Sequence, residues 1–173
     1  LATCRSLRDV ASLARLPLAA RSRLRRLTLG REENDAEHRQ GPSWPFADDA
    51  TLTLLIPALP KLERLALHNT GAVTDGGLEQ LAMACMGTGP FLGHIELTGV
   101  ELISADGCCI LASVESVATL EVLRCPGVST LQLLKHATGS AFSSLAVLRT
   151  TLSHARGGGG AAGDTTASAW LAL

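Results

Sequence analysis

Residues 62–84 read LERLALHNTGAVTDGGLEQLAMA and contain two apolar spacings in succession. The first half has the pattern L-x-x-L-x-L, formed by Leu62, Leu65 and Leu67. This pattern is typical of a short strand with one buried face. The second half places apolar residues at i, i+3, i+4 and i+7, namely Leu78, Leu81, Ala82 and Cys85. This spacing lines one face of a helix, so the stretch predicts a strand, a turn and a helix.

The same unit recurs farther along the chain. Its strand pattern is repeated by Leu92, Ile95 and Leu97. The shift from Leu62 to Leu92 is thirty positions, and the same shift carries further residues of the turn and helix onto similar ones. It pairs Val73 with Ile103, Thr74 with Ser104, Gly77 with Gly107 and Leu81 with Leu111. A repeat of this length that begins with L-x-x-L-x-L is the signature of a leucine-rich repeat. We therefore expect an α/β fold, a leucine-rich repeat solenoid with about five parallel strands and with helices on the convex side.

Further elements follow from the same spacing. The strand pattern begins at Leu24, Leu62, Leu92, Leu120 and Leu145. Helices are expected over residues 49–59, 76–86 and 107–117, with a shorter one on Val128, Leu131, Leu134 and Ala137. Pro57 should kink the first of these or end it early. An amphipathic helix over residues 6–16 would cap the open end of the solenoid.

Two segments interrupt the repeats. Residues 31–47 are polar and form a predicted insertion, which carries Trp44 either as a surface anchor or folded over the edge of the core. The sequence thus predicts a repeat domain over residues 1–155 and a glycine-rich tail over residues 156–173. Gly157 to Gly160 has the composition of a flexible linker. We expect the apolar end around Trp170 to pack on a partner.

Composition restricts the class of protein. The formal net charge is -1, and only 3% of the residues are aromatic. Arginines dominate residues 1–31 and acidic residues dominate 32–49, which indicates an interaction face or two solvated segments that neutralise each other. The odd cysteine number and the lack of a C-x-x-C pair favour a reducing compartment over disulfides or zinc. No apolar run is long enough to predict a membrane span.

The turn and helix from Val73 to Ala82, VTDGGLEQLA, resemble the cysteine-containing class of leucine-rich repeats. In that class a cysteine follows the strand and a second one ends the helix. Cys125 matches the first position and Cys85 the second. The chain departs from the pattern in two repeats, where Asn69-Thr70 and Glu115 replace the cysteine.

The resemblance implies one of two groups. The first comprises the substrate-recognition regions of F-box proteins in ubiquitin ligases. The second comprises mitochondrial proteins similar to ATP synthase coupling factor B (subunit s) and to the distal membrane arm assembly factor of complex I. The first predicted strand begins at Leu24, which leaves little room for an F-box and favours the second group. The Arg-rich opening also has the composition of a mitochondrial transit region.

Residues between the buried leucines should form rows on the concave face. Aligning the strands by their first leucine gives a first row of Arg26, Arg64, His94, Val122 and Val147. The second row is Thr28, Ala66, Glu96, Arg124 and Arg149, and the third is Gly30, His68, Thr98, Pro126 and Thr151. Arginine outnumbers glutamate in these rows. They predict a surface for carboxylates or phosphates, or else a sheet face that is merely solvated.

Catalysis finds little support in the sequence. Cys108 takes the place of Leu78 in the repeat and is expected in the core. His68, His94 and Glu96 lack the further ligand that a zinc site needs, and no cofactor or small-molecule substrate is predicted. We therefore expect a non-catalytic accessory subunit of a larger protein complex, mitochondrial or otherwise cytoplasmic. A ubiquitin-ligase substrate receptor and an RNA-contacting ribosomal subunit are the alternatives.

Overall fold

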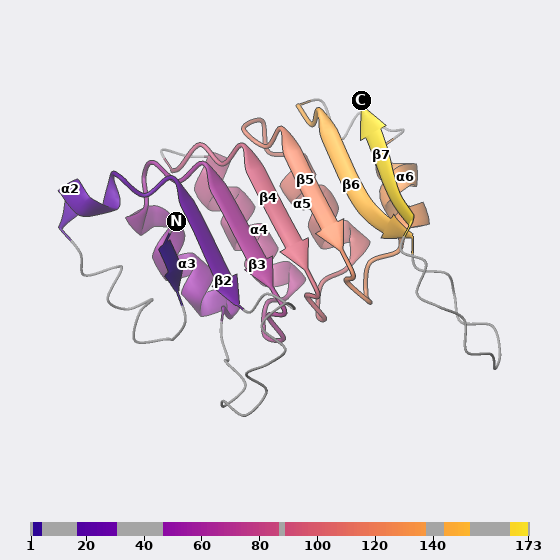
Figure 1. The fold of residues 1–173 in the computed structure, drawn as a ribbon, viewed down its shortest axis with the longest axis horizontal. Coiled ribbons are helices and arrows are strands. Elements are labelled where there is room, and N and C mark those ends of the chain that lie inside the picture. Colours follow the sequence, from indigo (N-terminus) through magenta and orange to yellow (C-terminus); the bar gives the residue numbers. More distant parts are fainter. Residues whose placement is uncertain are drawn as a thin grey trace.

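The described part of the chain forms one open sheet of seven strands in chain order (Figure 1). The computed structural model describes residues 2–4, 17–30, 47–86, 89–137, 144–152 and 167–172. The strands are β1 (Ala2–Cys4), β2 (Arg26–Gly30), β3 (Arg64–His68), β4 (His94–Thr98), β5 (Thr119–Leu123), β6 (Val147–Leu152) and β7 (Ala167–Ala172). Neighbours from β1 to β6 are parallel, and β7 is antiparallel to β6.

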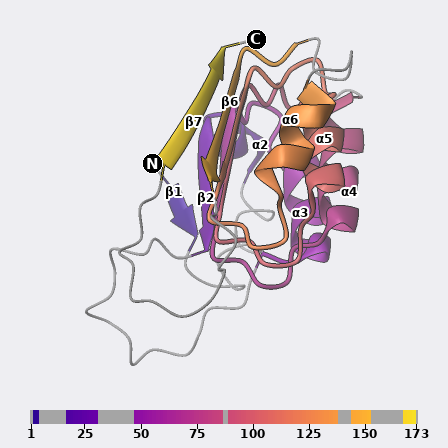
Figure 2. The same ribbon diagram turned by 90° about the vertical axis from the view of Figure 1, so that its right-hand side faces the viewer.

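Helices alternate with the strands. They are α2 (Leu18–Arg21), α3 (Asp49–Ala58), α4 (Asp75–Met86), α5 (Ala105–Ala112) and α6 (Thr130–Ala137). Helices α3 to α6 stack along one face of the sheet, and no described helix covers the other face (Figure 2). The prediction of an α/β fold with about five parallel strands and helices on one side is confirmed for β2 to β6.

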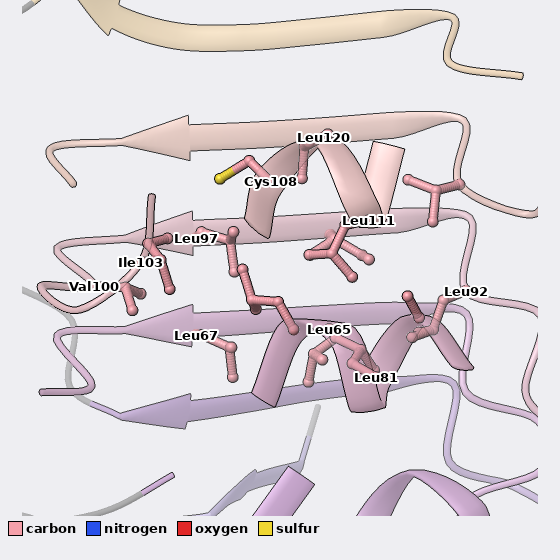
Figure 3. Close-up of a cluster of buried hydrophobic side chains, with 14 of the residues drawn as sticks. Leu65, Leu67, Leu81, Leu92, Leu97, Val100, Ile103, Cys108, Leu111 and Leu120 are labelled. Carbon is pink, nitrogen blue, oxygen red and sulfur yellow. The ribbon is translucent and has the colours of Figure 1, made fainter. Parts of the chain in front are cut away.

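The core lies between the sheet and the helices. Two rows of strand side chains point into it, Leu27, Leu65, Ile95, Leu120 and Leu148 in one and Leu29, Leu67, Leu97, Val122 and Thr150 in the other. Leu81 of α4 and Leu111 of α5 meet them from the helix layer (Figure 3). Each fully buried leucine stabilises the fold by about 1.5–3 kcal/mol relative to an exposed one. The aliphatic repeat pattern therefore forms one continuous core.

Carboxylates connect the beginnings of successive helices. Asp49 of α3 accepts hydrogen bonds from the backbone nitrogen (2.9 Å) and Oγ1 (2.6 Å) of Thr74, the residue before α4. The Asp49 side chain occupies the space where a Cβ on Gly77 would stand, so glycine is required there. Asp75 of α4 likewise accepts hydrogen bonds from the backbone nitrogen and Oγ of Ser104, the residue before α5. Helix α5 begins with Ala105, which has no carboxylate to continue the series.

Most predicted elements are confirmed, with shifts at their ends. Helix α3 ends one residue after Pro57, as expected. Helix α5 ends at Ala112 rather than 117, although Val117 is buried all the same. In α6 the buried leucine is Leu133, whereas the predicted Leu131 is exposed. Strands β1 and β7 were not predicted.

Some predictions fall outside the described residues. These are the helix over 6–16, nearly all of the 31–47 insertion, including Trp44, and the glycine run of the tail. The described part of the tail is β7, which pairs along β6. The predicted domain limits, 1–155 and 156–173, stay a prediction.

Candidate interaction surface

The face of the sheet opposite the helices carries the polar side chains of the strands. Adjacent residues in the ladder give a first row of Arg26, Arg64, His94, Thr119 and Val147. The second row is Thr28, Ala66, Glu96, Glu121 and Arg149. The third row is Gly30, His68, Thr98 and Leu123. Neighbouring strands are about 4.8 Å apart, so side chains in one row are within reach of each other.

The predicted alignment of β5 is wrong. The prediction aligned Leu120 with Leu92, but in the ladder Leu120 pairs with Ile95. The first apolar position of this repeat is therefore the buried Val117. Val122 is consequently buried, and Glu121 takes the place predicted for Arg124 in the second row. The spacing of Val117, Leu120 and Val122 was the signal for this alignment in the sequence.

Arg124 lies beyond β5, in a turn. Its φ is 54°, and the residues that follow β3 and β4, Asn69 and Gly99, have φ of 50° and 62°. The three residues are therefore equivalent positions of the repeat. The Arg124 backbone nitrogen donates to Thr151 Oγ1 at 2.8 Å. Arg124 therefore lies just after the carboxyl end of β5 and not in the second row.

Glu96 is held by side chains of its own strand and of β3. His68 Nε2 lies 3.2 Å from Glu96 Oε1, and Thr98 Oγ1 donates to the same oxygen at 3.3 Å. The hydrogen bond from His68 is the main reason that the pKa of Glu96 lies below its ordinary value of 4.5. Burial raises this pKa, whereas Thr98 and the charge of His94 lower it further. Glu96 is therefore a carboxylate at neutral pH.

Glu121 makes a second cluster on the neighbouring strands. Arg149 Nη1 donates to Glu121 Oε2 at 2.9 Å, and His94 Nε2 lies 3.6 Å from Glu121 Oε1. Only 16% of the Glu121 side chain is exposed. His94 and Arg149 were predicted on this face from the sequence, but the Glu121 carboxylate between them was not. The structure brings His68, His94, Glu96 and Arg149 together in this half of the face.

Arg26 and Arg64 stand at the other end of the same face. They are adjacent in the ladder between β2 and β3, and both are exposed. No acidic side chain of the described residues pairs with either of them. The neighbouring Arg25 does have a partner, because its Nη1 lies 2.7 Å from Glu63 Oε1. Trp170 belongs to β7, opposite Arg149 in the ladder.

A cavity of about 230 Å³ lies where β5 and β6 end. Its lining is Val122, Arg124, Cys125, Pro126, Val128, Thr150 and Thr151. Thr130 Oγ1 donates to the Thr151 carbonyl at 3.0 Å and lies 3.3 Å from Thr150 Oγ1. The cavity is smaller than the pockets of about 300–1,000 Å³ that hold drug-sized ligands. It coincides with the smaller residues, Val122 and Thr150, in a core row that is otherwise leucine.

Four cysteines, Cys85, Cys108, Cys109 and Cys125, are buried or half-buried free thiols. Cys108 is fully buried, which confirms its predicted place in the core. Burial raises the pKa of Cys85 and of Cys109 to about 11, and it also raises the pKa values of Cys108 and Cys125. At neutral pH these groups carry their protons, and a protonated thiol is a weak nucleophile.

The described residues contain no cluster of three or more His, Cys, Asp or Glu side chains placed to hold a metal ion. Across the same ranges, no helix has the length and apolar character needed to cross a membrane. No family model matches the sequence, and no curated protein matches it either.

Proposed function

We propose that this protein is a leucine-rich repeat protein of the cysteine-containing class. It would act as a non-catalytic accessory subunit of a larger protein assembly and bind partner subunits with the uncovered face of its sheet. The observation that carries the proposal is the division of the molecule into two faces. Helices α3 to α6 all lie on one side of the sheet, and no described helix covers the other side (Figure 2).

Two details support the repeat class. The Cys125 thiol lies 3.5 Å from the carbonyl oxygens of Leu97 and Leu123, so a cysteine at this position donates to the backbone of neighbouring strands. Val73 and Ile103, at the first position of the matched turn, are both buried. The hydroxyl of the threonine or serine that follows each of them donates a hydrogen bond to the first carboxylate of the preceding helix.

The paired charges support the binding role. Glu96 and Glu121 are each held by a histidine, and Glu121 also by Arg149, so these side chains are ordered before any partner arrives. Ordering a long side chain at an interface costs about 0.5–1.5 kcal/mol, and a preformed arrangement avoids part of this cost. A rigid sheet with fixed polar groups is therefore suited to protein recognition.

The proposal is tested by isolating the tagged protein from cells and identifying the proteins that co-purify with it. Ala66→Gln places a larger neutral side chain in the second row of the uncovered face. Ala50→Gln makes the same change at an exposed position of α3. We expect Ala66→Gln to weaken the complex and Ala50→Gln to leave it intact. A complex that is lost with Ala50→Gln and retained with Ala66→Gln would contradict the proposal.

A further inference from the structure

The charges of the uncovered face are distributed unevenly. Over β4 to β6, each described carboxylate has a basic partner on the face. The partner of Glu96 is His68, and the partner of Glu121 is Arg149. Over β2 and β3, Arg26 and Arg64 are exposed and have no acidic partner among the described residues. Within the described residues, one half of the face pairs its carboxylates with basic side chains, and the other half presents positive charge that has no acidic partner.

This positive charge is concentrated. Like charges directly opposite each other on neighbouring strands are destabilising, and Arg26 and Arg64 hold such a position. Arg23 and Lys61 lie three residues before them at equivalent positions of the repeat, and both are exposed. An anion that approached this end of the sheet would relieve the repulsion. Two neighbouring guanidinium groups bind carboxylates through paired, charge-assisted hydrogen bonds.

The residues next to the arginines are small. Thr28 and Ala66 follow Arg26 and Arg64 in the second row, and Gly30 occupies the third row of β2. Short side chains at these positions let a polypeptide backbone come close to the sheet. An extended segment that lies on β2 and β3 would therefore reach both arginines without displacing a large side chain.

From this arrangement we infer that the partner presents an extended acidic peptide segment to the β2–β3 end of the face, with its carboxylates on Arg26 and Arg64. The inference rests on the proposed function and specifies the chemistry of the partner. An acidic protein segment fits better than a nucleic acid. The whole chain has a net charge of -1, and the described positions of β2 and β3 on this face carry no Phe, Tyr or Trp side chain on which bases stack.

The test measures the fluorescence anisotropy of a labelled oligoglutamate peptide on titration with the full chain. Oligoglutamine and oligouridylate of equal length serve as the neutral and nucleic-acid probes. Arg64→Glu should weaken oligoglutamate binding, and Arg26→Glu/Arg64→Glu should weaken it by about tenfold or more. The matched control is Lys135→Glu, which makes the same charge change on α6 in the helix layer and should preserve binding. Circular dichroism verifies that each variant is folded.

The inference is overturned if Arg64→Glu and Lys135→Glu bind oligoglutamate equally well. It is also overturned if oligouridylate binds more tightly and depends on the same arginines. Its failure can be told apart from failure of the proposed function. A complex that is lost with Ala66→Gln but survives Arg26→Glu/Arg64→Glu keeps the sheet face as the binding surface and removes the acidic segment. A complex that survives both variants removes the proposed function.

Discussion

Asp75, the first residue of α4, accepts two hydrogen bonds from Ser104, the residue that caps α5. The Ser104 backbone nitrogen and its Oγ each lie 2.7 Å from an Asp75 oxygen. Ser104 Oγ in turn accepts from the Asp106 nitrogen at 3.1 Å. The side chain of one helix thereby fixes the beginning of the next. This polar connection joins the N-terminal ends of neighbouring helices, in addition to the leucine core that both helices share.

Asp75→Ala should lower the free energy of unfolding by about 1.5–3 kcal/mol, because hydrogen bonds to a charged group are lost and the Ser104 donors are left without their acceptor. Urea denaturation followed by circular dichroism measures the loss. The control is Asp106→Ala, whose side chain is 84% exposed and lies 3.4 Å from His136. We expect it to cost less than about 1 kcal/mol. Equal losses would show that the link to Ser104 contributes little.

Substitution by alanine should have different effects on stability at the two adjacent glycines of α4, Gly76 and Gly77. Gly77→Ala should destabilise the protein by about 1–3 kcal/mol, because the new Cβ would overlap the Asp49 carboxylate. At Gly76 the nearest atom, Thr74 Oγ1, would lie 3.4 Å from the new Cβ. Gly76→Ala should therefore be neutral or stabilising by up to about 1 kcal/mol.

A double-mutant cycle with Asp49→Ala checks the cause. Without the carboxylate, Gly77→Ala should lose most of its cost, so the two changes should be strongly non-additive in urea denaturation. Strict additivity would mean that the effect of Gly77→Ala comes from the helix backbone and not from Asp49.

Val122→Leu should raise the free energy of unfolding by about 0.8 kcal/mol, the contribution of one buried methylene group. Val122 lines the cavity of about 230 Å³ and stands in a core row in which β2, β3 and β4 carry leucine. The melting temperature by calorimetry reports the change. Leu97→Val, in the same core row but outside the lining of this cavity, should lower the free energy of unfolding. A lower melting temperature for Val122→Leu would show that the cavity does not admit the larger side chain.

Stability should depend on Glu96 in acid. Because the folded-state pKa of Glu96 lies below its ordinary value of 4.5, the unfolded chain takes up the proton first as the pH falls. The contribution of the Glu96 carboxylate is therefore complete above pH 4.5 and is lost as the pH falls through the lower folded-state value. The urea midpoints of wild type and Glu96→Gln should differ near neutral pH and converge in acid. A constant difference at every pH would contradict this expectation.

The repeat could be predicted because its core positions are chemically uniform. Leu62, Leu65 and Leu67 have the same spacing as Leu92, Ile95 and Leu97, and all six side chains are buried. In the ladder Leu65 pairs with Ile95 and Leu67 with Leu97, so the two sets form matching rows of the core. The sequence was ambiguous at β5, where Leu120 and Leu123 also satisfy L-x-x-L. The ambiguity is resolved by the turn geometry, since Arg124 shares the positive φ of Asn69 and Gly99.

The edge strands and the outward-facing residues of β5 could not be predicted. Strand β1 has three residues, and β7 is separated from β6 by a glycine-rich segment, so neither continues the repeat period. Their place depends on pairing with a sheet edge. Glu121 was missed because an error of alignment in one strand changes which residues face outward. The rows over β2 to β4 were correct because the register of these strands is fixed by repeated leucines. Val147 and Arg149 of β6 also occupy the rows predicted for them.

The bonds between successive helices also define a unit that can be copied. Residues 75–104 begin with the acceptor Asp75 and end with the donor Ser104, which are partners of each other. A duplicate of this segment inserted after Ser104 would bring its own acceptor and donor, and its Gly77 would leave room for the Asp75 side chain before it. The protein could thus be lengthened by whole turns without creating an unpaired group at the junction. In this architecture, the length of the chain is a variable that gene duplication can change in fixed steps.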